Sequence, residues 1–408
     1  MSTPSRGGDQ ALLLPVTGEG GQAPHDRESG PRKGRAHLTH VDLMRVVAFL
    51  AVVLVHVSGT TYPFPGAAPS FGQLMLHSMR MVFFFVSTFV LFYAWYDRPL
   101  HPGRFIGRRL RLIGIPYLAW SVAYWSLGDR WRIAHDPGAA LHDLRDVVVW
   151  GGAWYHLYFL LVSLQVAVLF PLFRLLVRRT RGRHGRLIAG AAALQAASLA
   201  VVFAPDPLGW APAEFYREHG FAFFPTYAFF LVAGALAAVH FDAFHHWVST
   251  HTRLCAGAVV AVLAVTYGAF RGNMADGMSP VAASNALQPV SLLWGAAVVW
   301  GLYTLCARWA AHGAPGRAAV AGGVDIAFGI YLVHPMVLRL LEMSGFAAWL
   351  PLPPLPATLV LWGIVAGLSG AAAYLIGRSP ASLLVGRERR PAAKPAGHRV
   401  RRHATAAL

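Results

Sequence analysis

The chain has 408 residues, of which 56% are hydrophobic and only 13% are charged. Apolar side chains in this proportion exceed what one soluble core could bury, which excludes an ordinary cytosolic enzyme. The net charge of +17, from 35 Lys and Arg against 18 Asp and Glu, would suggest nucleic acid as the partner of a soluble protein. In a membrane protein, the placement of the basic residues favours a role in topology instead.

Ten apolar stretches, each of about the 20 residues that a bilayer-crossing helix needs, follow one another along the chain. They are apolar on all sides and lack the alternation of a membrane β-barrel, so the sequence predicts an all-α polytopic bundle over residues 37–380. Disordered cytoplasmic tails rich in Gly, Pro and charge are expected at 1–36 and 381–408. The predicted spans are 41–60, 74–96, 110–127, 154–177, 187–204, 221–240, 254–270, 287–307, 324–343 and 357–377.

The basic residues are distributed unevenly between the two sides that these spans define. With the N-terminus inside, the cytoplasmic segments carry 27 Lys and Arg and the outer loops carry 5. By the positive-inside rule, this asymmetry predicts an even number of spans with both termini on the cytoplasmic side. Most of the positive charge is then explained by anchoring at anionic headgroups.

The first predicted span carries three ionisable residues, and such residues within a span suggest function because their burial is costly. At about 100° per residue, Asp42, Arg45 and His56 lie on one helical face, which makes them candidate catalytic residues. Arg45 and His56 are expected to lie about 16 Å apart along the axis. Asp42 and Arg45 can also form a topology-fixing ion pair, and His56 can be a general base or a hydrogen-bonded interior histidine; the sequence leaves these alternatives open.

Arg45, followed after ten residues by His56, is a first-span pattern of the bacterial membrane-bound acyltransferase family 3, which this chain resembles over nearly its whole length. The second span, MVFFFVSTFVLFYAW, resembles the aromatic run of the family, with Ser87 in place but Thr88 where Gly is usual. The remaining matches, in the order of the family, are Phe84 and Phe85 in that run, Arg108, Arg111 and Pro116 in RFIGRRLRLIGIPY, Tyr158 at the usual Trp position of HLYFLLVSLQVAVLFPLF, and Tyr331 and His334 in FGIYLVHP, where Ala327 replaces a common Ser.

The resemblance implies transfer of an acyl group, usually acetyl, from acyl-coenzyme A to a hydroxyl of a glycan, a lipid-linked sugar or a small natural product. Acetyl-CoA or another acyl-CoA is the expected co-substrate, without a metal; membrane lipids but no nucleic acid are expected as partners. Because coenzyme A is polyanionic, Arg108 and Arg111, one turn apart, are expected to bind it together with Arg45. Alternatively, Arg108 and Arg111 belong to the positive-inside belt of a bacterial plasma-membrane protein.

In this interpretation His56 removes the proton of the acceptor hydroxyl, which attacks the thioester carbonyl directly. An acyl-His intermediate is the competing mechanism. By family position, Ser87, Tyr331 and His334 are the candidates for stabilising the developing oxyanion. Ser87 can instead bond its own helix backbone, and Tyr331 with His334 can simply bridge the ninth and first spans.

His156 begins the predicted fourth span beside three aromatic residues, Trp154, Tyr155 and Tyr158. Such a cluster is most often an interfacial aromatic belt. If His56 opens toward the outer side, the cluster forms a stacking wall for a sugar ring. His156 is therefore a further candidate substrate-binding residue.

Other unusual residues inside the spans receive a structural interpretation. Cys255 and Cys306 are too few for a disulfide framework and are expected to be buried membrane residues. Arg80 in the second span and the pair Arg339 and Glu342 in the ninth are interpreted as structural or snorkelling side chains.

A secondary transporter is the main alternative class, since ten helices with buried charge would fit it by composition. Transporters usually have related halves with broken helices in matching places, and spans one to five share no Asp, Arg and His pattern with spans six to ten. A glycosyltransferase with a polyprenyl donor would need carboxylates in the first outer loop, to act as a base or to bind a metal. That loop, TYPFPGAAPSFGQ, has none. The sequence does not name the acceptor, the acyl length or the oligomeric state.

Overall fold

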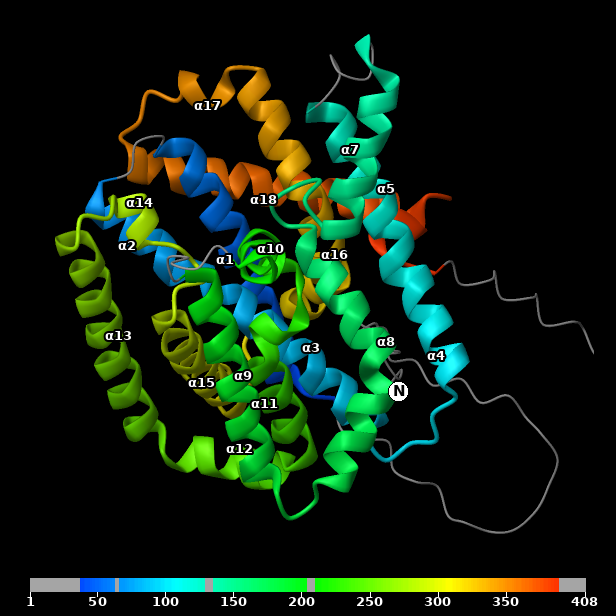
Figure 1. The fold of residues 1–408 in the computed structure, drawn as a ribbon, viewed down its shortest axis with the longest axis vertical. Helices are drawn as coiled ribbons and strands as arrows, with labels where there is room; N and C mark the ends of the chain where they lie inside the picture. Colours follow the sequence, from blue (N-terminus) through cyan, green and yellow to red (C-terminus); the bar gives the residue numbers. More distant parts are fainter. Residues whose placement is uncertain (1–36, 63–65, 129–134, 204–209, 389–408) are drawn as a thin grey trace, which may run out of the picture.

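The computed structural model describes residues 37–62, 66–128, 135–203 and 210–388; the predicted tail 1–36 and residues 389–408 of the predicted tail 381–408 lie outside this part of the chain. Within it, every regular element is a helix, and the helices form one bundle (Figure 1). The first half comprises α1 Thr39–Thr61, α2 Ala67–His77, α3 Met79–Trp95, α4 Pro102–Arg109, the π-helical turn η1 Leu110–Gly114, α5 Ile115–Gly128, α7 Pro137–Trp150 and α8 Tyr158–Arg179.

The second half begins with α9, which is followed by a pair of helical segments with a sharp bend between them. Its elements are α9 His184–Phe203, α10 Ala211–His219, the 3-10 turns η2 Gly220–Ala222 and η3 Phe224–Tyr227, and α11 Ala228–Val239. The remaining elements are α12 Phe241–Thr250, α13 Thr252–Ala275, α14 Pro280–Ala283, α15 Val290–Ala311, α16 Arg317–Met343, α17 Phe346–Trp349, α18 Pro354–Arg378 and the 3-10 turn η4 Ser382–Val385.

Length and apolar composition mark the helices that can cross a membrane. Eight of the described helices qualify, counting α2 and α3 as one, and the pair of α10 and α11, bent by 58°, brings the number to nine. These helices confirm the predicted all-α polytopic bundle. The predicted count of ten remains a prediction: the span expected at 110–127 falls on η1 and α5, which continue α4 without a break, so that residues 102–128 form one continuous helical segment.

Helix α1 lies in the interior of the bundle, where it packs against α2, α3, α15, α16 and α18. Its apolar residues are buried on several sides, as its nearly continuous apolar sequence requires. The same helix also buries three polar residues near its first turns, His40, Asp42 and Arg45. Charged and polar groups of α1 therefore face protein rather than lipid, which is the arrangement that intramembrane charge demands.

Helices α3 and α11 approach each other closely because Gly234 faces α3 without a side chain. A Cβ atom there would overlap the carbonyl group of Phe85 and the hydroxyl of Thr88. The hydroxyl of Thr88 donates to the carbonyl oxygens of Phe84 and Phe85 at 3.0 and 3.1 Å, so this side chain is held in place and cannot turn aside. The packing of α3, which carries one wall of the cavity described below, depends on this glycine.

Replacement of Gly234 by alanine is expected to destabilise the fold by about 1 to 3 kcal/mol, the usual cost of overpacking a close contact. The melting temperature of the purified protein in detergent measures this effect. Gly257 on α13 is the matched control, because nothing lies within 4 Å of the position that its Cβ would take. Alanine at position 257 should change stability by no more than about 1 kcal/mol, and equal losses in both variants would contradict the prediction.

Candidate active site

A cavity of about 260 Å³ lies beside the half of α1 that ends at Thr61. Its walls come from α1, α2, α3, α8 and α16 and from the segments that precede α8 and α15. Elements far apart in the sequence therefore meet around one space. Its polar lining residues are His56, His77, Arg80, Tyr155, His156, Tyr158 and Tyr331.

The ring of His56, on the wall of this cavity, lies between the rings of Tyr155 and His334. It is centred 4.2 Å from the ring of Tyr155 and 5.5 Å from that of His334, with interplanar angles of 31° and 26°. No hydrogen bond from any described residue engages its ring nitrogens, and the side chain is only half-buried. The imidazole is thus held by packing, while its nitrogens remain available to a molecule in the cavity.

The orientation of His334 follows from the proline that comes after it in α16. Pro335 has no N–H to donate to the carbonyl of Tyr331, four residues earlier in the helix. The Nδ1 atom of His334 donates to that carbonyl instead, at 2.8 Å, and also lies 3.1 Å from the carbonyl of Ile330. Because Nδ1 donates, Nε2 carries the lone pair, and it has no partner among the described residues.

A tyrosine hydroxyl replaces one backbone hydrogen bond of α16 next to His334. The hydroxyl of Tyr124 donates to the carbonyl of Leu332 at 2.6 Å and accepts from the backbone N–H of Met336 at 3.1 Å. This hydroxyl is inserted into the hydrogen-bond ladder of the helix, a recognised cause of helix bending. The polar groups of α16 next to His334 are therefore satisfied although the helix is interrupted.

His156 is also on the cavity wall and is almost fully buried, with 2% of its surface exposed. Its ring is centred 5.6 Å from that of His334 and 5.2 Å from that of Tyr331. Neither ring nitrogen has a hydrogen-bond partner in the described part of the chain, whereas its carbonyl accepts from the Tyr331 hydroxyl at 2.5 Å. The structure thus brings together His56, His156, Tyr331 and His334, which the sequence analysis had singled out separately.

The turn that delivers Tyr155 and His156 to the cavity depends on Gly151. This residue ends α7 with a left-handed conformation, φ 73°, which glycine adopts without strain. A Cβ atom here would lie 2.9 Å from the Cα atom of Tyr158. The chain can therefore turn sharply from α7 into α8, which places Tyr155 and His156 beside α1.

Asp42 and Arg45 lie at the other half of α1. Their side chains are 3.7 Å apart, as their spacing predicts, and Asp42 also lies 3.0 Å from the ring of His37. Arg45 lines a separate narrow void of about 10 Å³. Three aromatic residues, Phe83, Phe159 and Tyr331, line both this void and the cavity of His56. The predicted face of α1 therefore borders two spaces instead of one, and Asp42 has no described contact with His56.

Ser87 is placed apart from the other candidate residues. It lines a void of about 20 Å³ together with Phe159, Ser163 and Phe328, and it is not a lining residue of the cavity at His56. Phe159 borders all three spaces. The proposed contribution of Ser87 to an oxyanion site remains a prediction that this position does not favour.

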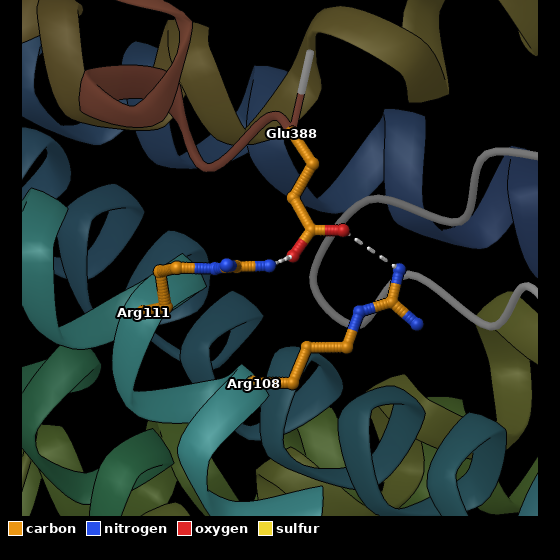
Figure 2. A network of polar contacts seen from close by, with 3 residues as sticks. All are labelled: Arg108, Arg111 and Glu388. Carbon is orange, nitrogen blue, oxygen red and sulfur yellow. Dashed lines mark hydrogen bonds and ion pairs between the residues drawn. The ribbon is translucent and has the colours of Figure 1, made fainter. Parts of the chain in front are cut away.

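Arg108 and Arg111 converge on one carboxylate. Arg108 Nη2 lies 3.3 Å from one oxygen of Glu388, and Arg111 pairs with the other oxygen (Figure 2). Glu388 follows η4, whose position is fixed by a 2.8 Å hydrogen bond from Trp120 Nε1 to the carbonyl of Leu384. The first residues of the segment predicted as a disordered tail, 381–388, thus include a helical turn that holds an anionic group against both arginines.

His77 is a cavity residue that the sequence analysis missed, and Arg80 is one that it interpreted as structural or snorkelling. Arg80 donates through Nη2 to the carbonyl of Ala286, and His77 Nδ1 lies 2.7 Å from the carbonyl of Gln73. A His and an Arg three positions apart in an apolar segment were the available signal, because this spacing places both on one side of a helix. The pair of Arg339 and Glu342 lies 3.4 Å apart, in keeping with its structural interpretation.

The helices and the cavity define a multi-pass membrane protein with a histidine-lined internal site. A family model described as an acyltransferase domain matches residues 38–376, and the chain belongs to acyltransferase family 3. This match confirms the resemblance drawn from the sequence and makes the protein an acyltransferase. Searches of curated proteins and of solved structures found no match.

Proposed function

We propose that the protein is an O-acyltransferase of the bacterial plasma membrane. It moves an acyl group, acetyl in the first instance, from cytosolic acyl-CoA to a hydroxyl of a glycan, a lipid-linked sugar or a small natural product. The observation that carries this proposal is the position of His56, whose free ring nitrogens face a cavity while Tyr155 and His334 hold its ring. A base fixed by packing beside an open space is suited to activating a hydroxyl.

In the proposed reaction His56 accepts the hydroxyl proton while the acceptor oxygen forms a bond to the thioester carbon. The tetrahedral intermediate then breaks its carbon–sulfur bond, and coenzyme A leaves as the thiol after taking the proton from the imidazolium. The negative charge on the carbonyl oxygen needs donors. His156 lines the cavity and has ring nitrogens without a described partner, so it can supply one. Tyr331 is the second candidate, and its hydroxyl would have to leave the His156 carbonyl to which it donates. No covalent enzyme intermediate is needed.

The donor enters from the cytoplasmic side in this proposal. Arg108 and Arg111 share one anion in the structure, Glu388, which supports their use as a site for the phosphates of coenzyme A. Arg45 provides a deeper cation on the way to His56. The void at Arg45 has room for about one water molecule, so the pantetheine arm can reach His56 only when Phe83, Phe159 or Tyr331 moves aside.

Binding of radiolabelled acetyl-CoA to the wild-type protein in lipid nanodiscs tests the donor assignment. We expect saturable binding and slow hydrolysis of the thioester in the absence of an acceptor. A protein that binds no acyl-CoA would overturn the assignment. Flux of a solute across proteoliposomes that is independent of acyl-CoA would instead support a secondary transporter.

Replacement of Glu388 by glutamine is expected to strengthen coenzyme A binding about threefold. The carboxylate occupies Arg108 and Arg111 and must be displaced, and partly exposed ion pairs of this kind contribute about 0.2 to 1 kcal/mol. Equilibrium binding of coenzyme A at low and high salt measures the effect, which should shrink at high salt. Glu218→Gln, at an exposed glutamate of α10, is the control, and weaker binding by Glu388→Gln would contradict the prediction.

A further inference from the structure

Arg80 is a cation on the wall of the His56 cavity. Its Nη2 atom donates to the carbonyl of Ala286, and its guanidinium interacts with the hydroxyl of Tyr158. Its Nε atom is buried and has no hydrogen-bond partner among the described residues. The side chain therefore does not extend toward lipid headgroups, as a snorkelling arginine would, but borders the space in which the acceptor is proposed to react.

The charge of Arg80 is not neutralised by a carboxylate on the cavity wall. No Asp or Glu belongs to the described lining of the cavity, and Arg80 forms no ion pair with a described residue. The carboxylate of Glu342 is bound by the hydroxyl of Thr60 at 2.8 Å and by Arg339 at 3.4 Å. A buried charge without an opposite charge beside it is costly within a membrane, so its presence in a cavity indicates a ligand that supplies that charge.

We infer that the acceptor carries an anionic group, a carboxylate or a phosphate, which Arg80 holds while the reacting hydroxyl lies at His56. This inference rests on the proposed function and adds the chemical class of its acceptor. The cavity, at about 260 Å³, is near the lower end of small-molecule sites. One acidic sugar unit or a phosphorylated polyol therefore fits the size and charge of the site. Arg80 is then a specificity-determining residue.

The electrostatic part of the inference is tested without any catalytic activity. Leu76 lines the cavity, and a cysteine at this position, in a chain with Cys255→Ala and Cys306→Ala, can react with small thiol reagents of either charge. The measured quantity is the ratio of reaction rates for a sulfonatoethyl and a trimethylammonioethyl methanethiosulfonate. An exposed reference cysteine, Ala139→Cys on α7, corrects for the intrinsic reactivity of the reagents.

We expect the ratio at Leu76→Cys to favour the anionic reagent, relative to the reference, by roughly threefold or more, because one unscreened cation nearby suffices for this effect. Arg80→Gln should abolish the preference, and Arg80→Lys, which keeps the charge but not the geometry, should retain it. A merely structural role of Arg80 predicts the same ratio in all three proteins. Such a result, or a thiol that reacts with neither reagent, would overturn the inference.

Acceptor selectivity provides a second arm of the test. Acetyl transfer from acetyl-CoA is compared for glucuronate against glucose and for glycerol 3-phosphate against glycerol, so that the two pairs distinguish a carboxylate from a phosphate. We expect a preference of about tenfold or more for one anionic acceptor, lost in Arg80→Gln through a higher KM. A role of Arg80 at the oxyanion would instead lower kcat for charged and neutral acceptors alike.

The two arms separate failure of the inference from failure of the proposed function. If the protein binds no acetyl-CoA and acetylates nothing, the proposed function is wrong, and the reagent ratio still decides whether the cavity attracts anions. If transfer occurs but charged and neutral acceptors are used equally well, the proposed function stands and the inference is overturned.

Discussion

Replacement of His56 by alanine is expected to lower acyl transfer by roughly 10²- to 10⁴-fold, the usual contribution of a general base, while acyl-CoA binding is unchanged. The imidazole borders the cavity through nitrogens that no described residue engages, and it lies apart from the arginines assigned to the donor. Its loss should therefore remove proton transfer but leave the phosphate contacts intact. The measurement is the rate of thioester consumption in nanodiscs together with the dissociation constant for acetyl-CoA.

The control for this variant is His142→Ala, which removes an exposed histidine of α7. It should leave both quantities unchanged. If His56→Ala retains transfer within about threefold of the wild type, His56 is not the base. If it loses acyl-CoA binding to the same extent as transfer, the variant has damaged the fold or the donor site, and the melting temperature distinguishes these two causes.

The kinetic order of the reaction distinguishes the two mechanisms open to His56. Direct attack by the acceptor requires both substrates to be bound together, whereas an acyl-His intermediate gives ping-pong kinetics and an acylated enzyme in the absence of acceptor. The contact between the rings of His56 and His334, centred 5.5 Å apart, leaves the ring nitrogens of His56 available at the cavity for either step. Rapid-quench experiments with labelled acetyl-CoA decide between them.

The fold class was predictable because apolar length is the dominant constraint on a membrane-spanning helix. The number of spans depends on how helices of mixed type are counted. The span expected at 110–127 coincides with a π-helical turn at Leu110–Gly114 that continues into α5, so neither element alone has the length of a span. Hydropathy reports composition along a segment and does not report a change of helix type within it.

The candidate site was predictable where one helix determines it and less so where several helices meet. Spacing alone gave the 3.7 Å pairing of Asp42 with Arg45. It could not show that Phe83 and Phe159 border two separate spaces along the same face of α1, because these side chains come from other helices. A helical wheel gives the direction of a side chain and says nothing of what a neighbour inserts beside it.

Arg80 also shows that the sequence around one residue does not reveal which neighbouring helices surround it. An arginine in an apolar span without an acidic neighbour in sequence can face lipid, a headgroup or an internal cavity, and its local sequence is the same in all three cases. Only the meeting of α3 with α8 and with the segment before α15 places it on the wall at His56. His334 was found through the family resemblance and His156 through its aromatic neighbours, and their meeting could not be predicted because they lie 178 residues apart in the chain.

Replacement of Arg45 by alanine is expected to raise the dissociation constant for acyl-CoA roughly 10- to 100-fold, the range for loss of a hydrogen bond to a charged group. Its side chain is buried and lines a void that shares Phe83 and Phe159 with the cavity of His56; in the proposed binding mode it contacts the donor and not the acceptor. The rate at saturating acyl-CoA should therefore change much less than the affinity. Steady-state kinetics over a range of donor concentrations separates the two quantities.

A second variant is needed because Asp42 and Arg45 form a buried pair. Removing one partner of such a pair leaves an uncompensated charge and can cost about 3 to 5 kcal/mol of stability. The double variant Asp42→Asn, Arg45→Gln neutralises both groups at nearly constant volume and should recover most of the melting temperature. If Arg45 binds the donor, acyl-CoA affinity stays low in this double variant. If affinity recovers together with stability, the pair only fixes the topology of α1, and the cation that receives the donor must be sought elsewhere.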